Sequence, residues 1–203
     1  MFCTRVWALV LIAFGLGSGA LKAQSVPLSV SARVGVIQAG GARVSEAGLA
    51  LYPELQLEAA LGTLAEGAIA ARAALYGGFW LKSAVESTRL CATCAAAGYR
   101  GYQAGARLRL AAHRGSFPLV LSAGVARQMV AVEEVGVWTD QGPAADQRAH
   151  FTLAELGLGV DFALSDGWRV QGEALGFLPV AAHENDPLNT GRYALLFGVA
   201  YAL

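Results

Sequence analysis

Two cysteines separated by two residues are the first positions in this sequence that could carry chemistry. Cys91 and Cys94 form a Cys-x-x-Cys motif. A zinc site would need two further Cys or His ligands at a suitable spacing, and none lies nearby. A thioredoxin-like redox site would need a βαβ context, which the flanking sequence does not show. In an exported protein, a disulfide bond between the two cysteines is the better interpretation.

A histidine near the C-terminus is the second candidate. Hydrolysis by a Ser/His pair needs a hydroxyl group within reach of an imidazole base. His183 is followed two residues later by Asn185 and not by a serine, so the nucleophile is missing. For His183, as for His113 and His150, a polar loop histidine is the default interpretation. We therefore predict that the protein is not an enzyme and that it holds no cofactor or metal.

Charged residues that recur at alternate positions form the third group. Nine of them fall on the face opposite the apolar face of their segments: Glu54, Glu58, Arg72, Arg107, Arg109, Glu155, Asp161, Arg169 and Glu173. Arg33 and Lys82 share that face. Five of the nine are acidic and four are basic, so they can pair almost completely. Because buried charges need partners, we predict that the nine form a paired network if their face is enclosed.

The segments that carry these charges have the period of two that is typical of β-strands. The last segment shows it most clearly, since Tyr193, Leu195, Phe197, Val199 and Tyr201 alternate with mostly small residues. The same pattern predicts eight strands, at about 28–37, 49–60, 68–82, 101–111, from 118 onward, 151–164, 168–180 and 192–203. Strand five loses its clear pattern at Arg127, which falls on the apolar side.

The connections between these strands alternate in length. Four are long, at 38–48, 83–97, 131–150 and 181–191, and the three between them are short. A chain that enters a membrane from the periplasm and meanders through it shows this asymmetry, with short inner turns and longer outer loops. The predicted strands are also longer than the usual five or six residues of soluble sheets.

Residues 1–23 read as a secretory signal peptide. Arg5 precedes an apolar run from Val6 to Leu16, and small residues follow. Cleavage is expected after Ala20 or after Ala23, and residues 24–203 form the predicted barrel domain. An uncleaved membrane anchor is the alternative, although the run is short for a span of about 20 residues.

The composition agrees with a protein of the membrane. The 203 residues are 55% hydrophobic and 15% charged, with a mean hydropathy of +0.46, which is more apolar than an ordinary soluble domain. Strong apolarity behind an export signal, without a further candidate for a spanning helix, is typical of a transmembrane β-barrel. Fifteen basic and fifteen acidic residues cancel, so nucleic acid is not an expected partner.

A soluble sandwich or lipocalin-like barrel would also show alternating faces, with the apolar face as its core. Aromatic residues near the strand ends favour the membrane instead, because such girdles lie at the level of the lipid headgroups. On the apolar face these are Phe79, Tyr102 and Tyr193 at the outer ends and Phe162, Trp168 and Tyr201 at the inner ends.

The end of the chain adds a motif. Gly198, Tyr201 and Leu203 follow the order glycine, two residues, an aromatic residue, one residue and a terminal hydrophobic residue. With the signal peptide and the eight strands, this ending resembles the small eight-stranded bacterial outer-membrane barrels of the OmpA/OmpX-like superfamily, over residues 25–203. The departure is Leu203, where the family usually has phenylalanine, which weakens the implied recognition by the barrel-assembly machinery.

This resemblance implies an all-β fold, an eight-stranded antiparallel up-and-down transmembrane β-barrel in the bacterial outer membrane. It also implies contact with outer-membrane lipid and lipopolysaccharide, and a monomer. The expected function is structural, or a surface interaction through the outer loops. Two alternatives stay open: a narrow conduit or binding site for a small hydrophobic ligand, and a lipid A-modifying enzyme. The second is similar to lipid A deacylase barrels, whose catalytic histidine and serine lie two residues apart near the C-terminus, where this chain has His183 and Asn185.

The cysteine pair gives a direct test. We predict that Cys91 and Cys94 are oxidised to each other in the mature protein, because the export compartment favours disulfides and the mature chain keeps an even number of cysteines. Thiol labelling of the denatured, unreduced protein should detect no free thiol, and labelling after reduction should detect two. Two free thiols before reduction would refute the disulfide.

Overall fold

The structure is a computed structural model that describes residues 27–38, 49–65, 68–85, 97–112, 118–134, 138–139, 142–143, 147–180 and 192–203. Its long strands are β1 (Leu28–Gln38), β2 (Leu49–Leu64), β3 (Ile69–Val85), β4 (Ala97–Ala112), β5 (Leu119–Glu134), β8 (Gln147–Ser165), β9 (Trp168–Pro179) and β10 (Arg192–Ala202). Two short strands, β6 (Trp138–Thr139) and β7 (Gly142–Pro143), pair with each other in the connection between β5 and β8. None of these ranges contains a helix able to cross a membrane.

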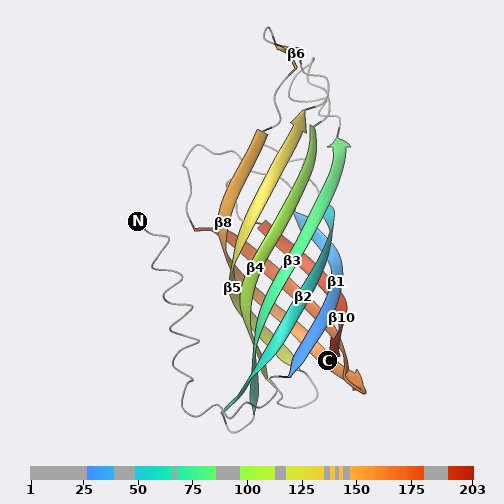
Figure 1. Ribbon diagram of the computed structural model, residues 1–203, viewed down its shortest axis with the longest axis vertical. Helices are drawn as coiled ribbons and strands as arrows, with labels where there is room; N and C mark the ends of the chain where they lie inside the picture. The colour runs from blue at the N-terminus through green and yellow to red at the C-terminus, as the bar shows by residue number, and fades with distance from the viewer. Residues whose placement is uncertain are drawn as a thin grey trace.

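The eight long strands close into one antiparallel barrel in which each strand pairs with its neighbours in sequence, and β1 pairs with β10 (Figure 1). The predicted all-β, eight-stranded, up-and-down fold is therefore confirmed. The register also fixes the slope of the strands. A row of paired residues that leaves β8 at Thr152 and passes through Arg127 returns to β8 at Phe162, ten residues further along. This stagger corresponds to a strand tilt of about 40°.

Several strands are longer than the sequence pattern predicted. β2 continues to Leu64, β3 to Val85 and β5 to Glu134, and β8 begins at Gln147. The predicted loops 83–97 and 131–150 were therefore too long at both ends. Backbone pairing continues in these extensions, as between Ala131 and Arg148. The alternation of apolar and polar residues stops earlier, because beyond the membrane both faces of a strand can meet polar surroundings.

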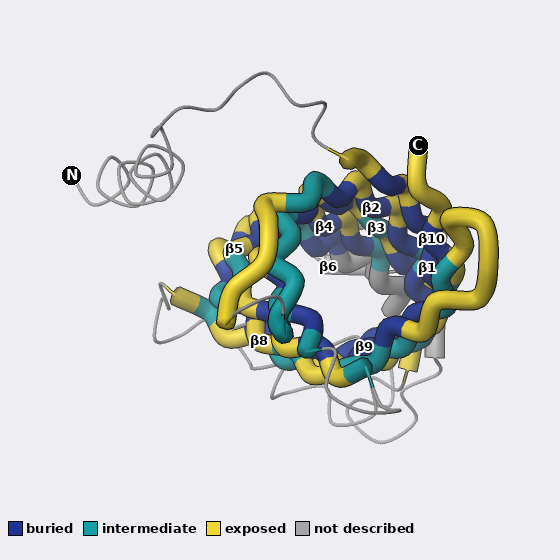
Figure 2. The backbone as a smooth tube through the Cα atoms, turned by 90° about the horizontal axis from the view of Figure 1, so that it is seen from below, coloured by how far each residue is buried: buried dark blue, intermediate teal, exposed yellow. Residues whose placement is uncertain are grey.

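The barrel has its apolar surface on the outside. Leu55 and Phe197 are 65% and 56% exposed, whereas the neighbouring inward residues Glu54 and Leu196 are buried. Buried and exposed positions alternate along the strands (Figure 2). A soluble sandwich or lipocalin-like barrel would bury the apolar face and expose the charges. The opposite arrangement suits a barrel surrounded by lipid.

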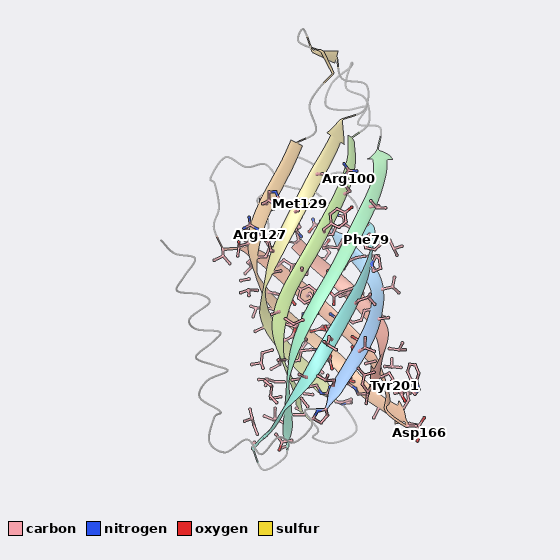
Figure 3. The ribbon with its side chains drawn as sticks, in the orientation of Figure 1. Phe79, Arg100, Arg127, Met129, Asp166 and Tyr201 are labelled. Carbon is pink, nitrogen blue, oxygen red and sulfur yellow. The ribbon has the colours of Figure 1, made fainter. Side chains whose placement is uncertain are left out.

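Aromatic side chains lie at both ends of the apolar band. Phe79 pairs with Tyr102 toward the outer end, and Trp168 pairs with Tyr201 toward the inner end, where the two rings are 4.9 Å apart. Phe79 and Tyr201 lie at clearly different heights (Figure 3). With the tilt given above and standard strand spacings, the two girdles are roughly 20 Å apart along the barrel axis. This separation is close to the apolar band of about 25 Å in outer-membrane barrels.

Arginine substitutions test which face meets lipid. Leu108, Leu158 and Phe197 point outward near the middle of the band, so replacing any of them with arginine should destabilise the barrel by about 2–4 kcal/mol. Leu51, which points outward at the level of the outer girdle, is the matched control and should lose only about 0–1 kcal/mol as arginine. Unfolding by urea in lipid vesicles measures both values. Equal, small losses at all four positions would contradict the membrane orientation.

Candidate functional site

Most of the buried charged side chains of the described residues point into the lumen, because alternate residues of each strand face inward. β2 directs Glu54 and Glu58 inward, and β4 directs Arg107 and Arg109 inward. The other charged side chains of the lumen come from β1, β3, β8 and β9. All nine residues of the network proposed from the sequence lie here: Glu54, Glu58, Arg72, Arg107, Arg109, Glu155, Asp161, Arg169 and Glu173. Eleven ion-pair contacts connect these residues and Arg33.

The central cluster consists of Arg33, Glu54, Arg107, Glu155 and Glu173. Arg107 lies at its middle, with Nη2 3.2 Å from Glu54 and Nε 2.6 Å from Glu155. Arg33 forms ion pairs with both Glu54 and Glu173. The side chains of all five residues are fully enclosed. The guanidinium carbon of Arg107 also lies 3.8 Å from the centre of the Tyr76 ring, a cation–π contact.

The inner cluster lies closer to the inner end and consists of Glu58, Arg72, Arg109, Asp161 and Arg169. Asp161 receives Arg72 and Arg169, each at 2.6 Å. Glu58 forms ion pairs with Arg109 and, at 2.8 Å, with Arg169. Arg72 and Arg169 retain 18% and 14% side-chain exposure, so this cluster is less completely enclosed than the central one.

Arg33 completes the charge balance of the lumen. The central cluster has three carboxylates and two guanidinium groups, and the inner cluster has two carboxylates and three guanidinium groups. Arg109 joins them through Glu173 at 3.6 Å, so five acidic and five basic groups form one neutral network. The sequence analysis placed Arg33 on the correct face but left it out of the network. The nine predicted residues contain one more carboxylate than guanidinium groups. This imbalance was the sign in the sequence that a further cation belongs to the network.

Apolar side chains fill the outer part of the lumen, which the sequence analysis did not predict. This outer layer includes Ile37, Tyr52, Trp80, Phe151, Leu153, Leu175, Phe177 and Leu196, all buried. Tyr52 and Trp80 meet edge to face, with their ring centres 6.0 Å apart. The inward positions of Tyr52 and Trp80 were readable from the alternation. The others were missed because their strands had been interpreted with polar or small inward residues.

Glycines on adjacent strands make room for these rings. A Cβ atom at Gly101 would lie 2.0 Å from the Trp80 ring, and one at Gly78 would lie 2.4 Å from the Tyr52 ring. No side chain fits at either position while the ring stays in place. Each large ring therefore occupies the space that a side chain on the next strand would have taken, which allows a narrow barrel to enclose several aromatic rings.

A chain of hydrogen bonds crosses the outer layer and ends in the central cluster. Arg192 donates to the Gln128 side-chain carbonyl, Gln128 donates to Gln103 at 3.0 Å, and Gln103 donates to the Tyr76 hydroxyl at 3.0 Å. Tyr76 in turn donates to the Glu155 carboxylate. All four bonds run in one direction, from a cation to an anion. Such aligned chains polarise and strengthen one another in a low-dielectric interior.

The predicted insertion signal lies at the inner end of β10. Tyr201 points outward and contacts Trp168, and the Leu203 amide donates to the Leu28 carbonyl at 2.8 Å. Gly198 approaches β1 closely, since a Cβ atom there would lie 2.2 Å from the Ala32 carbonyl oxygen. These contacts place all three residues on the seam where the first and last strands close the barrel.

Other predicted features lie outside the described residues. They are the signal peptide, the Cys91–Cys94 motif, His113, His183 and Asn185. His150 is described, and it is exposed on the outer part of β8. Within the ranges that the structure describes, no group of three or more His, Cys, Asp or Glu residues could hold a metal ion.

Solved outer-membrane proteins share this architecture. Neisserial surface protein A has a TM-score of 0.58 and 14% sequence identity, over 86% of this chain and 96% of that chain. The attachment invasion locus protein Ail of Yersinia pestis has a TM-score of 0.55 and 9% identity, over 89% and 100%. A major outer membrane protein of Thermus thermophilus also has a TM-score of 0.55, with 14% identity over 89% and 100%.

This chain has an OmpA/OmpX-like outer-membrane barrel fold. The outward apolar band and the fold together place the barrel in the bacterial outer membrane. No family model matches the sequence, and no curated protein matches it by sequence.

Two arginines of the network give a matched test of its burial. Arg107 is fully enclosed, so Arg107→Ala leaves buried carboxylates unpaired and should destabilise the barrel by about 3–5 kcal/mol. Arg72→Ala removes the same charge at a place that water can reach, and Asp161 still has Arg169 as a partner. The loss of stability should therefore be clearly smaller than for Arg107→Ala. Urea unfolding in vesicles compares the two variants. An Arg107→Ala barrel as stable as the wild type would show that the central cluster is solvated.

Proposed function

We propose that this protein is a closed outer-membrane barrel with a structural or surface-interaction role, exerted through the outer connections between its strands. The observation that carries the proposal is the filling of the lumen by three successive groups of side chains. From the outer end these are the outer apolar layer, the central cluster and the inner cluster. Eight strands enclose a space just wide enough for side chains, so little width is left for a solute path.

A conduit or binding site for a small hydrophobic ligand is the alternative, and the apolar outer layer is the observation that favours it. However, Tyr52, Trp80 and Phe177 are almost fully buried against their neighbours. A ligand would have to displace these rings and then pass ten charged groups whose pairing it would break. We therefore prefer the closed barrel, and we expect no enzymatic activity, because Asn185 stands where a serine nucleophile would be needed.

The chemistry of the outer connections indicates which partners they would suit. Segments 39–48, 86–96, 135–146 and 181–191 contain six acidic residues and two basic ones: Glu46, Glu86, Asp140, Asp146, Glu184, Asp186, Arg43 and Arg89. This excess of negative charge disfavours a polyanionic partner such as a nucleic acid or a sulfated sugar. A partner with a basic surface would instead be attracted by charge complementarity.

Single-channel recording tests whether the lumen is closed. The wild-type protein in planar bilayers should give no steady conductance steps, because the packed side chains leave no continuous water path. Replacing Arg33, Arg107 and Glu155 together with serine removes three of the five long side chains of the central cluster. This variant serves as the comparison, and we expect it to show brief openings above the wild-type baseline. Large and stable steps from the wild type would refute the closed barrel and favour the conduit.

A further inference from the structure

The inner mouth of the lumen, which Figure 2 views from below, is lined by small side chains. Inward positions near this end are alanines on four strands, and each alanine lies opposite or two residues from an inward polar residue. They are Ala60 on β2, Ala70 on β3, Ala163 on β8 and Ala202 on β10. Because an alanine side chain is short, it leaves the charged residues behind it open to the periplasm. Arg72 and Arg169 accordingly keep 18% and 14% side-chain exposure.

Arg72 and Arg169 lie side by side because they share one carboxylate oxygen. The Nη1 atom of each lies 2.6 Å from Oδ2 of Asp161. Arg169 also donates through Nη2 to Glu58 and to the Ser29 hydroxyl, each at 2.8 Å. Arg72 contacts carboxylates only through Nη1. Within the described ranges, its Nε and Nη2 atoms therefore have no acceptor, and two partly exposed guanidinium groups stand together at the mouth.

The charge at this end of the lumen is positive. The inner cluster has three guanidinium groups and two carboxylates, and the carboxylate that balances the third guanidinium is Glu173, 3.6 Å from Arg109. Glu173 belongs to the central cluster, which is fully enclosed and lies deeper in the barrel. A solute that enters the mouth from the periplasm therefore meets one net positive charge, carried by groups whose N–H donors suit the two oxygens of an oxyanion.

A pocket adjoins Arg169 at the end of the β8–β9 hairpin. It has a volume of about 300 Å³, and its lining includes Ala163, Trp168, Arg169 and Ala202. Arg169 pairs with Ala163 on β8, so no long side chain on that strand covers it. The Ala202 amide donates to the Gly167 carbonyl at 2.9 Å, which holds the hairpin turn against β10. This volume is at the lower end of the range for small-molecule sites.

We propose that this inner-mouth pocket binds a small organic carboxylate that arrives from the periplasm. Its carboxylate group lies against Arg169 and the free donors of Arg72, and its apolar part packs on the Trp168 ring, which is 46% exposed. A single negative charge matches the single positive charge in excess. Asp166 also lines the pocket and opposes an anion. It is exposed on the hairpin turn, near Tyr201 in Figure 3, so water and salt screen its charge.

This pocket opens on the opposite side of the membrane from the outer connections. The central cluster and the outer apolar layer close the lumen above it, so it is a binding site and not the entrance of a path. A barrel whose outer connections bound no partner, or one that conducted ions, could still hold the carboxylate. Failure of this proposal and failure of the proposed function can therefore be told apart.

Nuclear magnetic resonance of the folded, full-length mature protein in phosphatidylcholine nanodiscs tests the site through the indole N–H signal of Trp168. The probes are phenylacetate, its neutral counterpart phenylacetamide, and inorganic phosphate, each titrated separately. We expect phenylacetate to shift the signal saturably and to bind about tenfold more tightly than either of the others, because only it offers both a carboxylate and an apolar ring. An acetylated Ala-Phe dipeptide distinguishes the sources: binding extends the ligand class to peptide C-termini, and no binding restricts it to free acids.

Four variants separate charge, space and position. Arg72→Gln and Arg169→Gln should each weaken phenylacetate binding about tenfold, because a charge-assisted hydrogen bond is lost. Ala163→Leu fills the pocket without changing any charge and should abolish the shift. This variant also keeps the test valid if Arg169→Gln, which breaks two ion pairs, does not fold. Arg114→Gln is the matched control, because it removes one positive charge from the connection between β4 and β5 and should leave binding unchanged.

The heat-dependent shift of the folded barrel in gel electrophoresis verifies that each variant is folded. Equal phenylacetate binding by the wild type, Arg72→Gln and Ala163→Leu would refute the site. Equal binding of phenylacetamide would show that the carboxylate is not recognised, and equal binding of inorganic phosphate would show an anion site that does not select an organic ligand. A shift that never saturates, in the wild type and in Ala163→Leu alike, would assign the effect to phenylacetate in the lipid. Each of these results would overturn the proposal.

Discussion

The width of the barrel is the constraint on which the rest of this structure depends. Eight strands with a stagger of ten residues enclose only enough space for their own inward side chains. Water is largely excluded from the central part, so any charge placed there needs a partner close by. Five carboxylates and five guanidinium groups meet this requirement, because they alternate in space and each contacts at least one group of the opposite sign.

The lumen is filled partly by paired charges and partly by apolar side chains. Apolar packing alone, as in the outer layer, would fill the space without any cost of removing charges from water. A buried ion pair is only weak evidence of stability, since removing its charges from water can cost more than their attraction returns. The network nevertheless gives the strands specific partners. Arg33 on β1 joins Glu54 on the neighbouring strand β2 and Glu173 on β9. Its pair with Glu173 connects two strands that share no backbone hydrogen bonds, because β10 lies between them.

The inward and outward positions of the barrel wall carry different kinds of side chain. Inward positions carry paired charges, hydrogen-bonded polar groups, or apolar side chains that pack against one another, as where Trp80 lies against Gly101. Outward positions are apolar and need no specific partner, because lipid adapts to their shape. Among the described outward residues at or below the outer girdle, Arg127 is the charged exception, and its height at the aromatic girdle explains why the barrel tolerates it.

The sequence by itself determined the strands, their two faces and therefore the membrane location. These features depend on a period of two along each strand, which is a local property of the chain. Only the tertiary structure decided which charges pair, because Arg33 and Glu173 are 140 residues apart and meet only when β1 closes against β10. It also decided that the outer lumen is one packed apolar layer, since Tyr52, Trp80 and Phe177 lie on three different strands and come together only in the closed barrel. The ends of the strands were equally hidden, because backbone pairing continues past the membrane, where the side chains no longer alternate in polarity.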